Sequence, residues 1–326
     1  MSKWILVAVF AASFFFPRVL AQNAGNPVQV ALLRWYQANS VTQFATCATP
    51  QGLAFDRVHT WVACGGSANA LEELNASDGT LVATITGVAS PYAMVYDGAN
   101  IWATDLGAAT VTKVAAATGT VVGAYPVGAS PRGITFDGQY IWVTNSGSNS
   151  ISEILATTGA VTTYPLSTCV QPVGAVYDGA YVWVVCHTSN TIVQLGPTGT
   201  VLYTVPVGTA PTFAAYDGET AQSNGPFIWV ANNTSNTVSK VSVPNHTLIA
   251  SYNVGGGPYG VAFDGTYIWV ANGTGNTVTK LMQATGSLVG TYPASGGPAL
   301  DAPLFVAFDG GNVWLSNHSG STVSKF

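Results

Sequence analysis

The sequence contains few charged residues. Lys, Arg, Asp and Glu make up only 7% of its 326 residues, against 48% hydrophobic residues. The Lys and Arg residues are scattered, so we expect no nucleic-acid partner. Half of the 14 acidic residues occupy one repeated turn position, and the others show no calcium-loop spacing: Glu72, Glu73, Asp78, Asp105, Glu153, Glu219 and Asp301. Few carboxylates therefore remain for acid–base or metal chemistry.

The sequence also lacks a hydrophobic run long enough to cross a bilayer. The apolar run from Trp4 to Phe16 follows Lys3 and precedes a small-residue site ending at Ala21. This order predicts a secretory signal peptide over residues 1–21, and an uncleaved anchor is the alternative. We therefore expect a secreted or periplasmic protein that is not inserted in a membrane after signal cleavage.

One phrase recurs along the chain, as NIWATDLGAATVTK at 100–113, FIWVANNTSNTVSK at 227–240 and YIWVANGTGNTVTK at 267–280. Its alternating apolar, aromatic and β-branched residues around a Gly/Asn/Ser/Thr cluster predict a strand, a short loop and a second strand. An upstream run closed by Asp-Gly, as in PYGVAFDG at 258–265, and a downstream run, as in GSLVGTYP at 286–293, add two strands. Each repeat of about forty residues thus predicts four antiparallel strands, which is the blade of a β-propeller.

Seven copies of this repeat predict an all-β fold, a seven-bladed β-propeller of four-stranded antiparallel blades over residues 22–326. The blade repeats start near residues 50, 91, 131, 172, 211, 258 and 303. Each copy contains one Trp (Trp61, Trp102, Trp142, Trp183, Trp229, Trp269 and Trp314) and one turn Asp (Asp56, Asp97, Asp137, Asp178, Asp217, Asp264 and Asp309).

The seventh copy stops at Phe326, after its third strand. The missing fourth strand matches the segment WYQANSVTQFATCATP at 35–50, which aligns with residues 281–298 apart from short gaps. We therefore expect residues 35–49 to complete the last blade, so that an N-terminal strand closes the ring and covers its exposed sheet edges. The packing of residues 22–34 is left open.

The four cysteines occupy matched places in two repeats. Cys47 and Cys169 each stand three residues before a repeat Pro, and Cys64 and Cys186 each stand three residues after a repeat Trp. This register predicts the disulfides Cys47–Cys64 and Cys169–Cys186, which suit an oxidising compartment. Four buried free thiols are the alternative.

The repeated IWVTN at 141–145 and IWVAN at 228–232 and 268–272, followed by NTV and then TG, resemble the YVTN-type propeller repeats of exported bacterial proteins. They are also similar to the repeats of virginiamycin B (streptogramin) lyase, a seven-bladed propeller. The resemblance covers residues 35–326. It implies the fold more than the function, because the repeated residues are mostly those that pack blades.

In the lyase family, one blade carries a Glu followed two residues later by a His, with a further His from a neighbouring blade and a magnesium ion. The corresponding position here lies three residues after each repeat Trp, and we call it the ring position. None of its seven residues is Glu. They are Cys64, Asp105, Asn145, Cys186, Asn232, Asn272 and Asn317. His187 and His318 stand one residue later, offset from the family's pattern. Since acid–base elimination needs a titratable group at the substrate proton, we do not expect this lyase activity.

The top face of the ring is the face at which each innermost strand begins with the repeat Pro. Its central funnel should be surrounded by ring positions and by the residues after each Pro, and the candidate binding residues there are Asp105, Asn145, His187, His318, Arg132, Tyr92 and Tyr259. We expect a monomeric scaffold that binds an unidentified small molecule or protein in this funnel. Alternatively, the Asn side chains cap loops and both His are solvated.

A second hypothesis is a metal-dependent lyase or hydrolase of the streptogramin lyase or gluconolactonase type, with a divalent ion such as magnesium. Such an enzyme needs converging carboxylate or imidazole ligands and an open coordination site. Asp105 with Asn145 supplies only part of such a set, and His187 and His318 belong to separate repeats. The sequence therefore favours a binding protein without a metal or cofactor.

Overall fold

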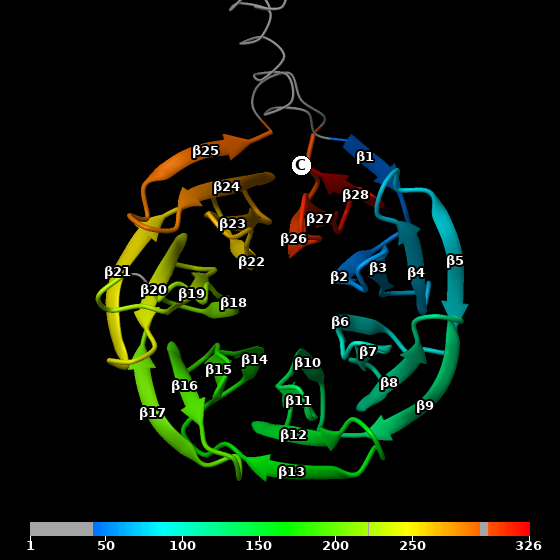
Figure 1. Cartoon of the computed structure of the whole chain (residues 1–326), viewed down its shortest axis with the longest axis horizontal. Helices are drawn as coiled ribbons and strands as arrows, with labels where there is room; N and C mark the ends of the chain where they lie inside the picture. The colour runs from blue at the N-terminus through cyan, green and yellow to red at the C-terminus, as the bar shows by residue number, and fades with distance from the viewer. Residues whose placement is uncertain (1–41, 221, 294–298) are drawn as a thin grey trace, which may run out of the picture. The chain divides into compact units, whose positions relative to one another are not determined.

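The described residues form 28 strands in seven antiparallel sheets of four, and these sheets form a ring (Figure 1). The structure is a computed structural model that describes residues 42–220, 222–293 and 299–326. The expected signal peptide at 1–21, residues 22–34 and the first part of the 35–49 segment lie outside this range. Within it there is no helix, and so none that could cross a membrane. The prediction of an all-β, seven-bladed propeller is confirmed.

The innermost strands begin at the repeat Pro residues, as β2 Pro50–Phe55, β6 Pro91–Tyr96, β10 Pro131–Phe136, β14 Pro172–Tyr177, β18 Pro211–Tyr216, β22 Pro258–Phe263 and β26 Pro303–Phe308. The second strands contain the repeat Trp, as β3 His59–Cys64, β7 Asn100–Asp105, β11 Tyr140–Asn145, β15 Val182–Cys186, β19 Phe227–Asn232, β23 Tyr267–Asn272 and β27 Val313–Asn317.

The third strands are β4 Ala70–Asn75, β8 Thr110–Ala115, β12 Ser150–Leu155, β16 Thr191–Leu195, β20 Thr237–Ser242, β24 Thr277–Met282 and β28 Thr322–Lys325. The outer strands are β5 Leu81–Thr86, β9 Thr120–Pro126, β13 Val161–Pro165, β17 Val201–Pro206, β21 Thr247–Asn253, β25 Leu288–Tyr292 and, in the last sheet, β1 Thr42–Ala45. Blades are numbered from the first, β2 to β5, to the seventh, β26 to β28 with β1.

The hydrophobic core lies mainly between neighbouring blades. Trp61 and Leu71 of the first blade pack with Ile101 and Val114 of the second, and all four side chains are fully buried. Because each sheet lies between its two neighbours, nearly all side chains of its second strand are buried on both faces. The ring is held together by seven similar interfaces.

The turn Asp and the Trp of each blade are joined by a hydrogen bond. In the second blade, Asp97 Oδ2 accepts the indole N–H of Trp102 at 2.7 Å, and Asp97 Oδ1 accepts the backbone N–H groups of Ala99 and Asn100. The Asp–Trp bond recurs in all seven blades at 2.7–2.9 Å. Each Asp therefore closes the hairpin between the first two strands and satisfies a buried indole donor.

Neighbouring innermost strands approach closely at the third residue of each. This residue is Gly in four blades, and a Cβ on Gly133 would lie 2.5 Å from the carbonyl oxygen of Val173, while one on Gly174 would lie 2.6 Å from that of Thr212. The pairing with the second strand is also irregular here in every blade. Glycine permits this approach and so keeps the central channel narrow.

The last sheet contains strands from both ends of the described chain. Strand β1 pairs antiparallel with β28 and takes the outer position, in the order β1-β28-β27-β26 (Figure 1). The ring of Phe44 on β1 lies 5.6 Å from that of Trp314, and Lys325 Nζ donates to the carbonyl of Ala76 in the first blade at 2.7 Å. These contacts connect the seventh blade to the N-terminal segment and to the first blade.

Candidate functional site

The ring positions are buried inside their blades. Asn145 is fully buried, and its Nδ2 donates to Ser150 Oγ at 3.1 Å and to Ser152 Oγ at 2.9 Å on the next strand. The ring-position Asn residues of the last three blades make the same pair of bonds. This geometry supports the alternative in which these side chains cap the loop between the second and third strands.

In five blades the residue three before the repeat Pro contacts the ring position of the same blade. A Cβ on Gly128 would lie 2.7 Å from Cγ of Asn145, and Gly208 and Gly255 meet their Asn partners in the same way. In the first and fourth blades the same two positions hold the disulfides Cys47–Cys64 and Cys169–Cys186, as the sequence predicts. The disulfide and the Gly–Asn contact are therefore alternative ways to fix the entry of the innermost strand.

Asp105 occupies the ring position of the second blade. Its Oδ2 accepts hydrogen bonds from the hydroxyls of Thr110 at 2.8 Å and Thr112 at 2.6 Å, and its Oδ1 accepts the N–H of Ala89 at 3.3 Å. Burial raises the pKa of this carboxyl group, and the bonds from Thr112, Thr110 and Ala89 oppose the shift only in part. Both oxygens are engaged within the blade.

We expect Asp105→Asn to increase the free energy of unfolding at pH 7 by about 1 kcal/mol, because a neutral amide avoids the desolvation of a buried carboxylate. A carboxyl group whose pKa is raised by folding stabilises the protein below its unfolded pKa of about 3.9, and this contribution is lost as pH rises through the folded pKa. Urea unfolding at pH 4 and pH 7 measures both effects. The matched control Asn145→Asp should lower stability at pH 7, and a less stable Asp105→Asn variant would contradict this reading.

Tyr92, Arg132 and Tyr259 come together at the mouth of the central channel. The hydroxyls of Tyr92 in the second blade and Tyr259 in the sixth are hydrogen-bonded to each other across the ring. The guanidinium of Arg132 lies 5.4 Å from the Tyr92 ring, and Phe305 packs edge-on against both tyrosines at 5.5 and 5.7 Å. Burial raises the pKa of both hydroxyls, so that they stay neutral hydrogen-bond donors.

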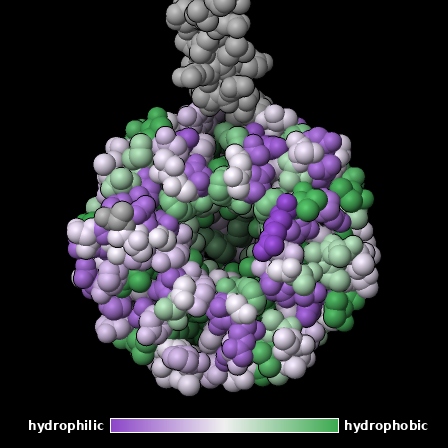
Figure 2. Space-filling view, viewed as in Figure 1, coloured by the Kyte–Doolittle hydropathy of each residue, from purple (hydrophilic) through white to green (hydrophobic). Residues whose placement is uncertain are grey.

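The channel next to this aromatic group is apolar. It contains a cavity of about 140 Å³, whose lining includes Ala93, Met94, Phe213, Val261 and Phe305. A space-filling view shows a hollow at the centre of the ring with hydrophobic residues inside it (Figure 2). The site therefore combines an apolar channel with one cation and two phenols.

Among the described residues, several side-chain atoms near the top face are buried without a hydrogen-bond partner: Thr49 Oγ1, Gln51 Oε1, Arg132 Nε, His318 Nδ1 and the Oδ1 atoms of Asn145, Asn232, Asn272 and Asn317. Buried polar groups are usually paired, so these atoms can receive the polar groups of a ligand. His187 instead places Nδ1 2.9 Å from the carbonyl oxygen of Pro211, and so donates to it. The two imidazoles belong to the fourth and seventh blades.

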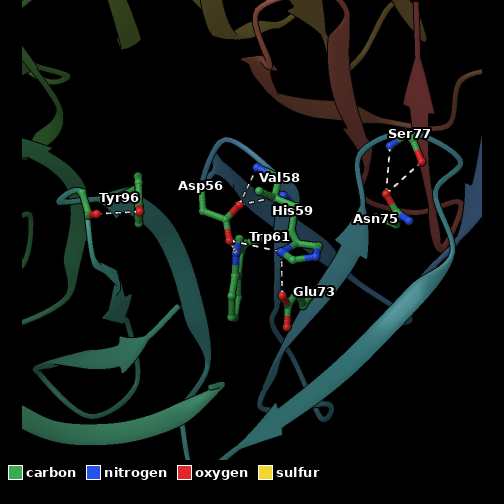
Figure 3. Close-up of polar contacts among 9 residues, drawn as sticks. Asp56, Val58, His59, Trp61, Glu73, Asn75, Ser77 and Tyr96 are labelled. Carbon is green, nitrogen blue, oxygen red and sulfur yellow. Dashed lines mark hydrogen bonds and ion pairs between the residues drawn. The ribbon is translucent and has the colours of Figure 1, made fainter. Parts of the chain in front are cut away.

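The first blade carries a cluster that sequence reasoning missed, at the turn between its first two strands (Figure 3). His59 Nδ1 lies 2.8 Å from Glu73 Oε1 and 3.4 Å from Asp56 Oδ2, which also accepts the indole N–H of Trp61 at 2.8 Å. Burial raises the pKa of Glu73, although the charge of His59 opposes this. Ligand atoms of Asp56, His59 and Glu73 lie within 4.8 Å of one another, so the set can hold a proton or a divalent cation.

A departure from the repeat could have revealed this cluster. The residue opposite the repeat Trp is Lys in four blades, whereas it is Glu73 in the first. The residue three after the turn Asp is Asn or Tyr in most blades, whereas it is His59 here. Such paired departures from a repeat indicate a local interaction that the other blades do not make.

The chain matches no protein-family model and no curated protein. It is similar to solved structures of a streptogramin B lyase, at 19% identity over 88% of this chain and 96% of that chain with a TM-score of 0.74, and of virginiamycin B lyase from Staphylococcus aureus, at 18% over 88% and 98% with a TM-score of 0.73. A Kuenenia stuttgartiensis hydrazine synthase chain also matches, at 17% over 86% and 95% with a TM-score of 0.70. At these identities the likeness shows the fold alone. The resemblance to the virginiamycin B lyase propeller is thus confirmed at the level of the fold.

Proposed function

We propose that this protein is an exported β-propeller that binds a small molecule in its top-face funnel. The observation that carries the proposal is the convergence of Tyr92, Arg132 and Tyr259 beside an apolar channel of about 140 Å³. Ligand sites are concave and mostly apolar, with a few polar groups that fix orientation. The funnel has this composition, whereas the Asp105 carboxylate and the Asn145 amide nitrogen bond within their own blades.

The chemistry of the funnel favours a ligand with an apolar body and an anionic group. Arg132 offers an unpartnered, buried Nε–H, and guanidinium groups bind carboxylates through parallel hydrogen bonds. The two phenol hydroxyls are neutral and bonded to each other, so an acceptor on the ligand can replace that bond. We propose that the apolar part of the ligand then enters the channel lined by Ala93, Met94 and Phe213.

Export is part of the proposal. Each of the two disulfides connects the loop before an innermost strand to the end of the second strand, and disulfides persist in oxidising compartments. The expected signal peptide at 1–21 supports the same conclusion. A protein in the periplasm or outside the cell would meet its ligand in solution.

The test is calorimetric titration with 3-phenylpropionate, which joins a carboxylate to a small aromatic group. We expect saturable one-to-one binding that Arg132→Gln weakens about tenfold, since a hydrogen bond to a charged group contributes about 1.5–3 kcal/mol. The matched control is Arg57→Gln, at the turn between β2 and β3, which should leave affinity unchanged. No saturable binding, or equal binding by the Arg132→Gln variant, would overturn the proposal.

The second candidate function is that of a metal-dependent lyase or hydrolase. It is favoured by the names of the solved structures with this fold, one of which is a catalytically inactive virginiamycin B lyase with Quinupristin, at 18% identity over 88% of this chain and 98% of that chain with a TM-score of 0.74. The predicted metal ligands fit this function only in part, because both Asp105 oxygens already accept hydrogen bonds, whereas Asn145 Oδ1 is buried without a partner.

Incubation with quinupristin and magnesium distinguishes the two candidates. The binding proposal expects the compound to be recovered unchanged, as judged by chromatographic retention and fragmentation in tandem mass spectrometry, because elimination within a ring leaves the mass unchanged. Ring opening that is lost in His318→Ala, whose Nδ1 is the unpartnered imidazole atom of the top face, would favour the enzyme.

A further inference from the structure

Four blades contain a built-in site for an ammonium group. The residue opposite the repeat Trp is a lysine, and its Nζ lies over the indole ring at 4.7 Å for Lys113 and Trp102, 4.9 Å for Lys240 and Trp229, 4.6 Å for Lys280 and Trp269, and 5.3 Å for Lys325 and Trp314. Three of these ammonium groups donate to the next blade, at the carbonyls of Ala156, Gln283 and Ala76. The repeat thus supplies an aromatic face and a backbone acceptor for a cation.

The third blade carries Glu153 at this position, opposite Trp142. A pocket of about 260 Å³ opens there towards the fourth blade, and its lining includes Trp142, Glu153 and Pro197. Pro197 stands three residues after Gln194, which is opposite Trp183, just as Ala156 stands three residues after Glu153. The carbonyl of Pro197 is therefore the counterpart of those that accept lysine ammonium groups elsewhere.

The pocket is acidic as well as aromatic. Asp137 and Glu153 line it together with Tyr140, Tyr177 and Tyr181. Burial, followed by the charges of Asp137 and Asp178, raises the pKa of the Tyr177 hydroxyl, which is the direction expected beside negative charge. The third blade thus keeps the aromatic ring and the backbone carbonyl that surround a lysine ammonium in other blades, but it has the Glu153 carboxylate where those blades have the lysine.

The first blade shows how the fold treats a Glu at this position. Glu73 also replaces the lysine there, and its partner is the imidazole of His59, whose Nδ1 lies 2.8 Å from the carboxylate. His59 stands three residues after the turn Asp of its blade, and the residue three after the turn Asp of the third blade is Tyr140. The third blade therefore has the carboxylate and the aromatic face, but a neutral phenol where the first blade has imidazole.

We propose that the pocket between the third and fourth blades binds a primary alkylammonium group, at the place where four other blades hold the ammonium of their own lysine. The ammonium lies between the Trp142 ring and the Glu153 carboxylate and donates to the Pro197 carbonyl. The alkyl chain packs against Tyr177 and Tyr181. This site is separate from the top-face funnel and does not depend on the function proposed for it.

The test is a calorimetric titration of the whole protein with n-butylammonium chloride. We expect saturable one-to-one binding, weakened at least tenfold in Glu153→Gln, which keeps the shape of the side chain but removes its charge. Glu153→Lys should abolish binding and melt no lower than the parent, because the new lysine finds the same partners as Lys113 does in the second blade. The matched control is Asp301→Lys, the same charge change at an exposed residue, which should change affinity less than twofold.

Two further probes sharpen the result. Nα-acetyl-lysine N-methylamide presents the same ammonium group on a peptide backbone. If it binds as tightly as n-butylammonium, the site is assigned to a lysine of another protein. If only n-butylammonium binds, the site is assigned to a small amine. The proposal is overturned if the parent binds neither probe, if n-butanol binds as tightly as n-butylammonium, or if Glu153→Lys binds like the parent.

Discussion

A chain that begins at Thr49 should melt well below a chain that begins at Thr42. The shorter chain lacks β1, so β28 loses its antiparallel partner and becomes an exposed edge, and Trp314 loses the ring of Phe44. Removing a packed aromatic side chain costs about 3–5 kcal/mol, so we expect a loss of at least about 3 kcal/mol in the free energy of unfolding. Differential scanning calorimetry measures the change, and light scattering reports aggregation through the open edge.

The Thr49 chain also lacks Cys47, so the disulfide effect must be separated from the strand effect. The matched control is the chain that begins at Thr42 with Cys47→Ala and Cys64→Ala, compared with the Thr49 chain carrying Cys64→Ala. The disulfide itself is expected to contribute about 3 kcal/mol. If these two cysteine-free chains melt together and both stay monomeric, β1 does not stabilise the ring.

The second large effect is expected for Asp97→Ala. The substitution removes the acceptor for the Trp102 indole, which is fully buried, and for the backbone N–H groups of Ala99 and Asn100. Hydrogen bonds to charged groups contribute about 1.5–3 kcal/mol, and the buried donor left behind adds to the cost, so we expect a loss of about 3 kcal/mol. Urea unfolding at pH 7 measures it, and Asp301→Ala, at an exposed Asp, should change stability by less than about 0.5 kcal/mol.

The turn aspartates should also determine stability in acid. Burial opposes their charge, but hydrogen bonds from the indole and from turn donors hold the pKa of Asp56, Asp97 and Asp309 below the ordinary value. A carboxyl group with a lowered folded pKa stabilises the protein above its unfolded pKa of about 3.9, and the contribution is lost as pH falls through the folded pKa. The parent should therefore lose stability below about pH 4 more steeply than Asp97→Ala. If the free energy of unfolding of the two proteins falls in parallel as the pH is lowered, the account is contradicted.

Much of the fold could be predicted because the repeat is regular. The spacing of Pro, turn Asp and Trp gave the number of blades, and the register of four cysteines gave both disulfides. The Asp–Trp hydrogen bond was not predicted, although both residues recur five apart in six blades. Sequence reasoning assigned the Asp to turn geometry alone, and the bond depends on how the indole folds back over the hairpin.

The candidate site was predictable only in part. The second residue of each innermost strand was expected at the channel mouth, and in two blades this residue is Tyr92 or Tyr259, whose hydroxyls are hydrogen-bonded to each other. The reach of one tyrosine to the other depends on the width of the channel, which follows from the close approach at Gly133 and its counterparts. Asn145 was expected in the funnel, but antiparallel pairing sets it directly opposite Ser150, so its amide bonds within the hairpin.

The crystal structure of the protein purified from its native source tests the central claim most directly. The proposed function predicts electron density for a small organic ligand at the channel mouth, with an anionic group on Arg132 and an apolar part beside Phe305 and Phe213. The Tyr92–Tyr259 hydrogen bond should then be replaced by bonds to that ligand. A native protein whose tyrosine pair stays closed, with a metal ion or reaction product held elsewhere on the top face, would contradict the account.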